Sequence, residues 1–447
     1  MSGRGAQWMD ALRTQLWPLP TLAIALAVVM GTVLPAVDAA VDGQLPGSVT
    51  VLLFSGGPEA ARSVLQAISG SLITVTSLTF SLTVVTLQLA SSQFSPRLLR
   101  TFTSDRFVHV TLALFLAAFA FALTVLRSVR DETLGISLFV PEISVTVAFG
   151  LAIASVIGLV LFLAHLTREI RVETMMRRVN LETQDTIDRV FPEGRAVPEL
   201  EPVPAPEQVL INSTRSGFLT SFDRGALMRA AEVAGAVIRI DREPGSSLVE
   251  GVPFATAWTV EPGAAFTPAV RGKLTHDLND AVATGFERTN VLDVGFGFRQ
   301  LVDVAARALS PGINDPTTAV HVIGHLSVLL GRLADRNPGP EHLTDEDGRV
   351  RVVVSLPGLT GLLDMAMNQP RQYGAADSAV TGRLLGLLQE LTWRDRRGRY
   401  RAEILDHLGR MRTAIDAADY LPAERRRLLD QADSIDLLSA PGNRENQ

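Results

Sequence analysis

Residues 63–96 read SVLQAISGSLITVTSLTFSLTVVTLQLASSQFSP, a run of 34 residues without a charged side chain. A helix needs about 20 mainly apolar residues to cross the hydrocarbon core of a bilayer. This stretch is long enough, and we expect it to cross the membrane as one helix. The sequence therefore predicts an integral membrane protein.

Three further apolar stretches of sufficient length lie on either side of this one. They run from about residue 16 to 37, from about 107 to 126 and from about 140 to 163. The first of them has a signal peptide as its alternative, because Arg4 and Arg13 precede it and small residues follow it. Its apolar region is longer than the roughly 7–15 residues of a signal peptide, which favours a membrane span. We expect four spans in all.

The distribution of arginines around the spans predicts their orientation, since positive residues concentrate on the cytoplasmic side. With the N-terminus inside, nine arginines fall inside and three outside. The inside set is Arg4, Arg13, Arg97, Arg100, Arg106, Arg168, Arg171, Arg177 and Arg178, and the outside set is Arg62, Arg127 and Arg130. Both termini are therefore expected in the cytoplasm of a multi-pass protein of the cell (inner) membrane.

Composition divides the chain into four parts. Residues 1–166 are expected to form an α-helical polytopic membrane domain, and residues 167–206 an amphipathic helix followed by a Pro-rich linker. Residues 207–264 show short strand patterns separated by turn residues, and residues 265–447 are mainly helical with a hairpin near residues 345–354. The expected fold is a membrane domain followed by a cytoplasmic α+β domain.

Composition also excludes several classes of function. The chain has no cysteine, which excludes disulfides, thiolate catalysis and cysteine-ligated metal centres. Its net charge of -6 offers no basic surface for nucleic acid. No phosphate-binding loop, nucleophile elbow or paired-carboxylate site is present, so we expect neither an enzyme nor a bound cofactor.

The second span carries the functional argument. At 100° per residue, nine of the twelve positions in an arc of about 100° bear a hydroxyl or amide group. A second stripe of Thr79, Thr83 and Thr86 lies roughly opposite. The candidate pore-lining residues of the first arc are Gln66, Gly70, Thr74, Ser77, Ser81, Gln88 and Ser92.

Two interpretations of this polar arc stay open. Lipid cannot satisfy polar groups, so the arc should face protein or water. It either packs against another helix through small residues and hydrogen bonds, or it lines a water-filled pathway. Ionisable residues at depth would indicate a proton path, but Glu142, His109 and His165 fall near span ends. A passive pore is therefore favoured over a proton-driven transporter.

Two long motifs resemble those of a bacterial family of membrane proteins known as domain of unknown function 2254. The first is SLTFSLTVVTLQLASSQFSPR, residues 77–97, and the second is RALSPGINDPTTAV, residues 307–320. A shorter third match is GFGFRQLVD, residues 295–303. The resemblance covers nearly the whole chain, and it implies a membrane topology without implying an activity.

The β-rich part contains EPGSSLVEGVPFA, residues 243–255, which resembles the spacing of small lipoyl-like barrels. No lysine lies in this segment, so it cannot be a site of lipoylation or biotinylation. We expect a small barrel with a structural role there.

The second motif and the residues directly after it carry the candidate ligand or ion site of the cytoplasmic domain, which consists of Asn314, Asp315, His321 and His325. Asp315 followed by Pro316 is a good N-cap and first-turn pair for a helix, although a helix N-terminus can also hold an anion. His321 and His325 share a helix face, but the sequence lacks the glutamate of a zincin motif. We therefore favour a helix cap and ordinary, partly buried histidines over a ligand or ion site, and we expect no bound metal.

Three functions remain after these arguments. The first is a homo-oligomeric channel for inorganic ions, with the second span lining a pore and the cytoplasmic domain regulating it. The second is a non-conducting scaffold or sensor in the lipid bilayer, whose larger cytoplasmic domain binds a ligand or partner. A membrane-tethered enzyme is the third, and it has only Asp315, His321 and His325 to support it.

Overall fold

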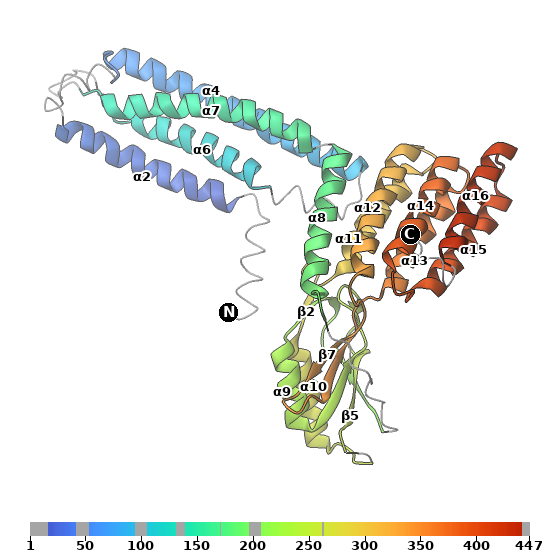
Figure 1. The fold of residues 1–447 in the computed structure, drawn as a ribbon. Helices are drawn as coiled ribbons and strands as arrows, with labels where there is room; N and C mark the ends of the chain where they lie inside the picture. The colour runs from blue at the N-terminus through green and yellow to red at the C-terminus, as the bar shows by residue number, and fades with distance from the viewer. Residues whose placement is uncertain are drawn as a thin grey trace. The chain divides into compact units, whose positions relative to one another are not determined.

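The four apolar stretches form four long helices, as expected: α2 (Pro18–Val41), α4 (Pro58–Gln93), α6 (Arg106–Leu126) and α7 (Glu142–Glu169). They run side by side (Figure 1) and belong to the first of two units, residues 1–174 and 175–447. This computed structural model describes residues 17–41, 53–93, 105–130, 139–169, 171–195, 207–261 and 263–439. The predicted linker after residue 195 lies largely outside this part.

Helices α2 and α6 approach closely because small residues face the contact. Ala27, Gly31 and Pro35 recur every four residues on the buried side of α2. A Cβ atom at Gly31 would lie 2.8 Å from the Cβ of Thr124 on α6. Small residues at this spacing let the backbones of two membrane helices approach closely. In a bilayer such helices associate through van der Waals contacts, because lipid is as apolar as the side chains and gives no hydrophobic driving force.

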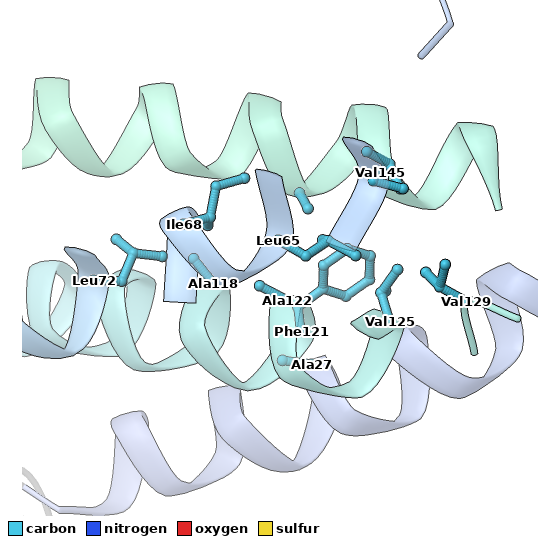
Figure 2. Close-up of a cluster of buried hydrophobic side chains, with 12 residues drawn as sticks. Ala27, Leu65, Ile68, Leu72, Ala118, Phe121, Ala122, Val125, Val129 and Val145 are labelled. Carbon is cyan, nitrogen blue, oxygen red and sulfur yellow. The ribbon is translucent and has the colours of Figure 1, made fainter. Parts of the chain in front are cut away.

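The core of the first unit lies between α4, α6 and α7. Figure 2 shows Leu65, Ile68 and Leu72 of α4 packed with Phe121 and Val125 of α6, with Val145 of α7 nearby. All six side chains are buried. Helix α6 packs against α2, α4 and α7, which explains why it is the most buried of the four helices.

Polar contacts tie one end of this unit together. Asp38 of α2 is 7% exposed and accepts hydrogen bonds from the backbone N–H groups of Ile143 and Ser144, at 2.9 and 3.0 Å. These two groups belong to the first turn of α7, whose N–H groups have no partner within the helix. Asp38 thus caps α7 from a different helix.

The second unit begins within α8 (Val172–Val190) and contains two small sheets. The five-stranded sheet has the order β1-β5-β3-β8-β7, and the three-stranded sheet the order β4-β2-β6. Their strands are β1 (Val209–Asn212), β2 (Gly217–Phe222), β3 (Ala236–Ile240), β4 (Ser247–Leu248), β5 (Pro253–Thr259), β6 (Val282–Gly285), β7 (Glu341–Thr344) and β8 (Val350–Val354).

The small barrel expected within residues 207–264 is not confirmed. Strand β3 pairs in parallel with β8, which lies more than a hundred residues later, and β2 pairs with β6. The predicted hairpin near residues 345–354 is confirmed as the antiparallel pair β7 and β8. The β-rich segment thus completes its sheets with strands from the following segment, because its own strands do not close on one another.

The helices of the second unit are α9 (Arg224–Ala234), α10 (Pro268–Ala281), α11 (Val294–Ala308), α12 (Pro316–Ala334), α13 (Leu359–Gly374), α14 (Ser378–Arg394), α15 (Arg401–Ala417) and α16 (Pro422–Ser439). Five described helices are long and apolar enough to cross a membrane, and α12 is the fifth beside α2, α4, α6 and α7. Helix α12 packs against α11, α13 and α14. Its apolar composition is that of a central core helix.

Helix α8 is held firmly within the second unit. A Cβ atom at Gly297 of α11 would lie 1.8 Å from Thr183 Oγ1, so only glycine permits this crossing. Asp188 accepts from Arg332 of α12, and Arg336 lies 2.7 Å from the same carboxylate. Gly297 of the third motif, residues 295–303, therefore serves helix packing.

The α2–α6 contact leads to a first prediction. Replacing Gly31 with leucine should destabilise the protein by about 1–3 kcal/mol, because the side chain must displace Thr124. Thermal unfolding of the full chain in detergent measures this. Gly150 on α7 has no atom within 4 Å of its would-be Cβ, so Gly150→Leu is the matched control. Equal stability of the two variants would contradict the close α2–α6 contact.

Candidate functional site

One face of α4 turns inward over its whole described length. Buried positions recur at helical spacing from Ala61 through Leu65, Ile68 and Leu72, and from Thr76 onward they are threonines. We call Thr76, Thr79, Thr83 and Thr86 the threonine ridge. Each ridge hydroxyl donates to the backbone carbonyl four residues earlier, at 2.6–2.8 Å. The ridge therefore satisfies its polar groups within its own helix and packs dry against the bundle.

The opposite face of α4 carries the predicted pore-lining residues. In the single chain six of them are exposed: Gln66, Gly70, Thr74, Ser77, Ser81 and Gln88. We call these six residues the polar face. Ser92 also falls within α4, but its side chain lies outside the described part. The structure thus brings the described candidates onto one surface of the first unit.

The exposed surfaces of the neighbouring helices are apolar by contrast. On α7 the exposed side chains include Phe149, Ile153, Val156, Val160 and Leu161. On α2 they include Leu22, Leu26, Val29 and Val33. A bilayer accommodates such surfaces directly, whereas it leaves exposed hydroxyl and amide groups without partners. The hydroxyl and amide groups on the polar face of α4 therefore need protein or water beside them rather than lipid.

Two acidic residues near the helix ends, Asp105 and Asp38, make contacts that the sequence analysis missed. His165 Nε2 lies 2.5 Å from Asp105 Oδ2, and Asp105 also caps α6 by accepting from the N–H of Phe107 at 2.8 Å. Asp38 likewise caps a helix, since it accepts from backbone N–H groups of α7 that lie about a hundred residues later in the chain. The position of Asp105 directly before an apolar run is a capping signal that could have been read. Nothing in the sequence places Asp38 beside residue 143.

In the second unit, Asp315 is confirmed as the N-cap of α12 with Pro316 in the first turn. Its carboxylate accepts from the Thr318 N–H at 3.0 Å and from the Thr318 hydroxyl at 2.6 Å. These bonds, the hydroxyl bond first, lower the pKa of Asp315. The preceding Asn314 has φ of 49°, a left-handed conformation that asparagine tolerates better than most residues. The motif thus builds a sharp turn between α11 and α12.

The two histidines of α12 do not converge on a shared site with this turn. His321 is exposed, whereas His325 is half-buried and its backbone carbonyl accepts from Asn180 of α8. Burial, and then the neighbouring His321, lowers the pKa of His325. Within the described ranges no three His, Asp or Glu side chains gather as metal ligands. A ligand or ion site at residues 314–325 stays a prediction.

The comparisons with known proteins agree with the membrane character of the first unit. The profile of the family described as "Predicted membrane protein (DUF2254)" matches residues 13–390. Uncharacterized proteins of Mycobacterium bovis and of Mycobacterium tuberculosis strain H37Rv are each 33% identical over 445 residues. The match covers 98% of this chain and 82% of each relative. No solved structure matches this chain.

The turn before α12 leads to a second prediction. Replacing Asp315 with alanine should cost about 1 kcal/mol of stability through loss of the cap. Because the pKa of Asp315 is lowered, this stabilisation is present at neutral pH and is lost as the pH falls below about 4. Denaturant unfolding of the full chain in detergent, with His321→Ala as the exposed control, measures the difference. An equal effect of both variants would contradict the capping role.

Proposed function

The chain belongs to the predicted membrane protein family DUF2254, and on that premise we propose that it forms a homo-oligomeric channel lined by the polar face of α4. The exposure of this face in the single chain is the observation that carries the proposal. The bundle already buries the threonine ridge on the other side of the same helix. The polar face is therefore the side of α4 left for other copies of the chain and for water.

The physical argument rests on what a bilayer can solvate. Polar groups that face hydrocarbon without partners cost several kcal/mol each. Gln66 and Gln88 carry amide groups with two donors and an acceptor, which one helix backbone cannot satisfy. Several copies arranged with their α4 helices inward would place these groups around water. Rings of neutral hydroxyl and amide groups are a known lining for pores.

The chemistry of the lining suggests the solute. Residues 63–96 contain no charge, so the proposed pore would not bind one sign of ion tightly. Small inorganic ions crossing passively are the class that such a lining suits. Asp188 and Gly297 fix α8 against α12 and α11 within the second unit. Helix α8 follows α7 in the chain, so it connects this unit to the proposed membrane helices. In this proposal the second unit regulates the pore, with no catalytic step and no cofactor.

A non-conducting scaffold or sensor is the second candidate function. One observation favours it: the hydroxyl of Thr74 on the polar face donates to the backbone carbonyl of Gly70 at 3.0 Å. Ser71 does the same toward Ala67 at 2.7 Å. Hydroxyl groups satisfied in this way can pack dry against a second copy, without a water-filled path. The polar face would then be an assembly surface alone.

The proposal includes a topology of four spans with both termini in the cytoplasm and α12 kept within the second unit. A reporter enzyme fused after Gln447 should be active only on the cytoplasmic side. A reporter inserted within residues 42–57 should behave as external. An external C-terminus would contradict the arrangement.

Cysteine substitution tests the water-filled pore, since the chain has no native thiol to interfere. In liposomes containing the full chain, water-soluble thiol reagents should label Ser77→Cys and Ser81→Cys. They should spare Thr83→Cys, because the threonine ridge is buried. They should also spare Val85→Cys, a position that is exposed in the single chain but lies beside the polar face.

The functional readout of the same surface is ion flux. Ser81→Leu should reduce flux from the liposomes while the oligomer keeps its size on a sizing column. Thr83→Leu should instead disturb folding or assembly, because the ridge has no room for a larger side chain. Protection of Ser77→Cys and Ser81→Cys together with an intact oligomer would favour the scaffold over the channel.

A further inference from the structure

A pair of unfilled hydrogen-bond acceptors lies buried between α13 and α15 of the second unit. His407 of α15 is 3% exposed, and its Nδ1 atom is buried without a hydrogen-bond partner. One turn earlier, Glu403 Oε2 is likewise buried without a partner. Residues four apart on a helix lie on one face, with Cβ atoms about 6 Å apart. The two free acceptors therefore belong to the same side of α15.

The neighbours of His407 fix which ring nitrogen is free. His407 Nε2 lies 3.2 Å from Asp364 Oδ1 on α13. A carboxylate accepts only, so Nε2 carries the proton and Nδ1 carries the lone pair. Burial, the largest cause, lowers the pKa of His407. A histidine that binds a metal through one ring nitrogen usually donates its other ring N–H to a carboxylate in this way.

The glutamate is positioned in a similar way. The Thr360 hydroxyl of α13 donates to Glu403 Oε1 at 3.2 Å and so holds one oxygen of the carboxylate. The other oxygen is left facing the buried side without a donor. A buried carboxylate oxygen without a hydrogen-bond partner has lost its water without replacement, so a cation bound in this place would relieve the desolvation cost.

We propose that His407 Nδ1 and Glu403 Oε2 bind a divalent transition metal ion of the zinc class. Imidazole nitrogen and carboxylate oxygen are both regular zinc ligands, and water would complete the coordination. In this site Asp364 is a positioning residue that orients His407, and Thr360 orients Glu403.

The local charge favours a cation. Asp364, Asp406, Arg371 and Arg410 act electrostatically on His407. Arg410 is itself paired, with its Nη1 atom 3.2 Å from Asp364 and its Nη2 atom 2.5 Å from Asp406. The Arg371 guanidinium, whose Nε is buried without a partner, is the charge that opposes a cation here, and the Glu403 carboxylate four residues before His407 is the charge that favours one. Two protein ligands make a weaker site than three or four, which suits reversible occupation.

Metal binding is tested on the full chain, purified in detergent with a histidine-free tag and stripped with a chelator. Titration with Zn²⁺ should show one ion bound per chain, and Mg²⁺, which prefers octahedral oxygen ligands, should not compete. Co²⁺ in place of Zn²⁺ should give the visible absorption of a low-coordinate nitrogen and oxygen site. A wild-type chain that binds no Zn²⁺, and so holds only water or a proton there, would overturn the proposal.

Three variants assign the binding to these residues. His407→Gln and Glu403→Gln should each abolish the saturable Zn²⁺ binding and the Co²⁺ spectrum. Asp364→Asn should weaken binding by about 10-fold or more while keeping the spectrum, as expected for a residue behind the ligand. His276 is 74% exposed, and its Nε2 atom lies 3.5 Å from Asp280, a carboxylate four residues away in the chain, as Glu403 is from His407. The variant His276→Gln is therefore the matched control. Circular dichroism confirms that each variant is folded, and unchanged binding in a folded Glu403→Gln variant would overturn the assignment.

Discussion

Helix α4 carries polar groups on two opposite faces, and a bilayer offers water to neither of them. The bundle solves this problem on one side only. Thr76, Thr79, Thr83 and Thr86 return their hydroxyl groups to their own backbone and pack inward against the core. The other face, from Gln66 to Gln88, is left at the surface of the single chain. The proposed assembly of several copies follows from this asymmetry, because a second copy or water must take the place of lipid there.

The rest of the first unit is arranged to keep α4 in this orientation. Small residues bring α2 against α6, and Leu65, Ile68 and Leu72 of α4 fill the space between α6 and α7. Asp38 fixes the start of α7 from α2 through two backbone N–H groups. In the second unit α12 has the central place, and α8 is bound to it and to α11 by an ion pair at Asp188 and a close crossing at Gly297.

Periodicity and composition were sufficient to predict the four long helices, the short strands within residues 207–264 and the cap at Asp315. These features depend on local signals: apolar length, alternation, and a carboxylate before a helix. The pairing of β3 with β8 could not be predicted, because it joins segments more than a hundred residues apart that carry no mark of their partnership. The small barrel was expected from residues 243–255 considered alone. In the structure the strands of this region pair with the later strands β6 and β8 instead.

The candidate sites divide in the same way. Helical periodicity predicted that Gln66, Ser77 and Ser81 share one face of a helix, because an unbroken helix fixes their angles whatever surrounds it, and all three are exposed in the single chain. The environment of His407 was out of reach, because Asp364 and Thr360 come from another helix. The Asp38 contact with α7 was missed for the same reason. Sequence reasoning therefore identified faces of single helices, and only the fold revealed contacts between them.

The central claim is that the polar face of α4 looks toward other copies of the chain and toward water. Electron cryomicroscopy of the full chain in lipid nanodiscs tests this most directly. The account predicts a closed ring of subunits in which Ser77, Ser81 and Gln88 of every α4 point toward a hydrated central axis. A monomer, or an oligomer in which these side chains face the lipid belt, would contradict it.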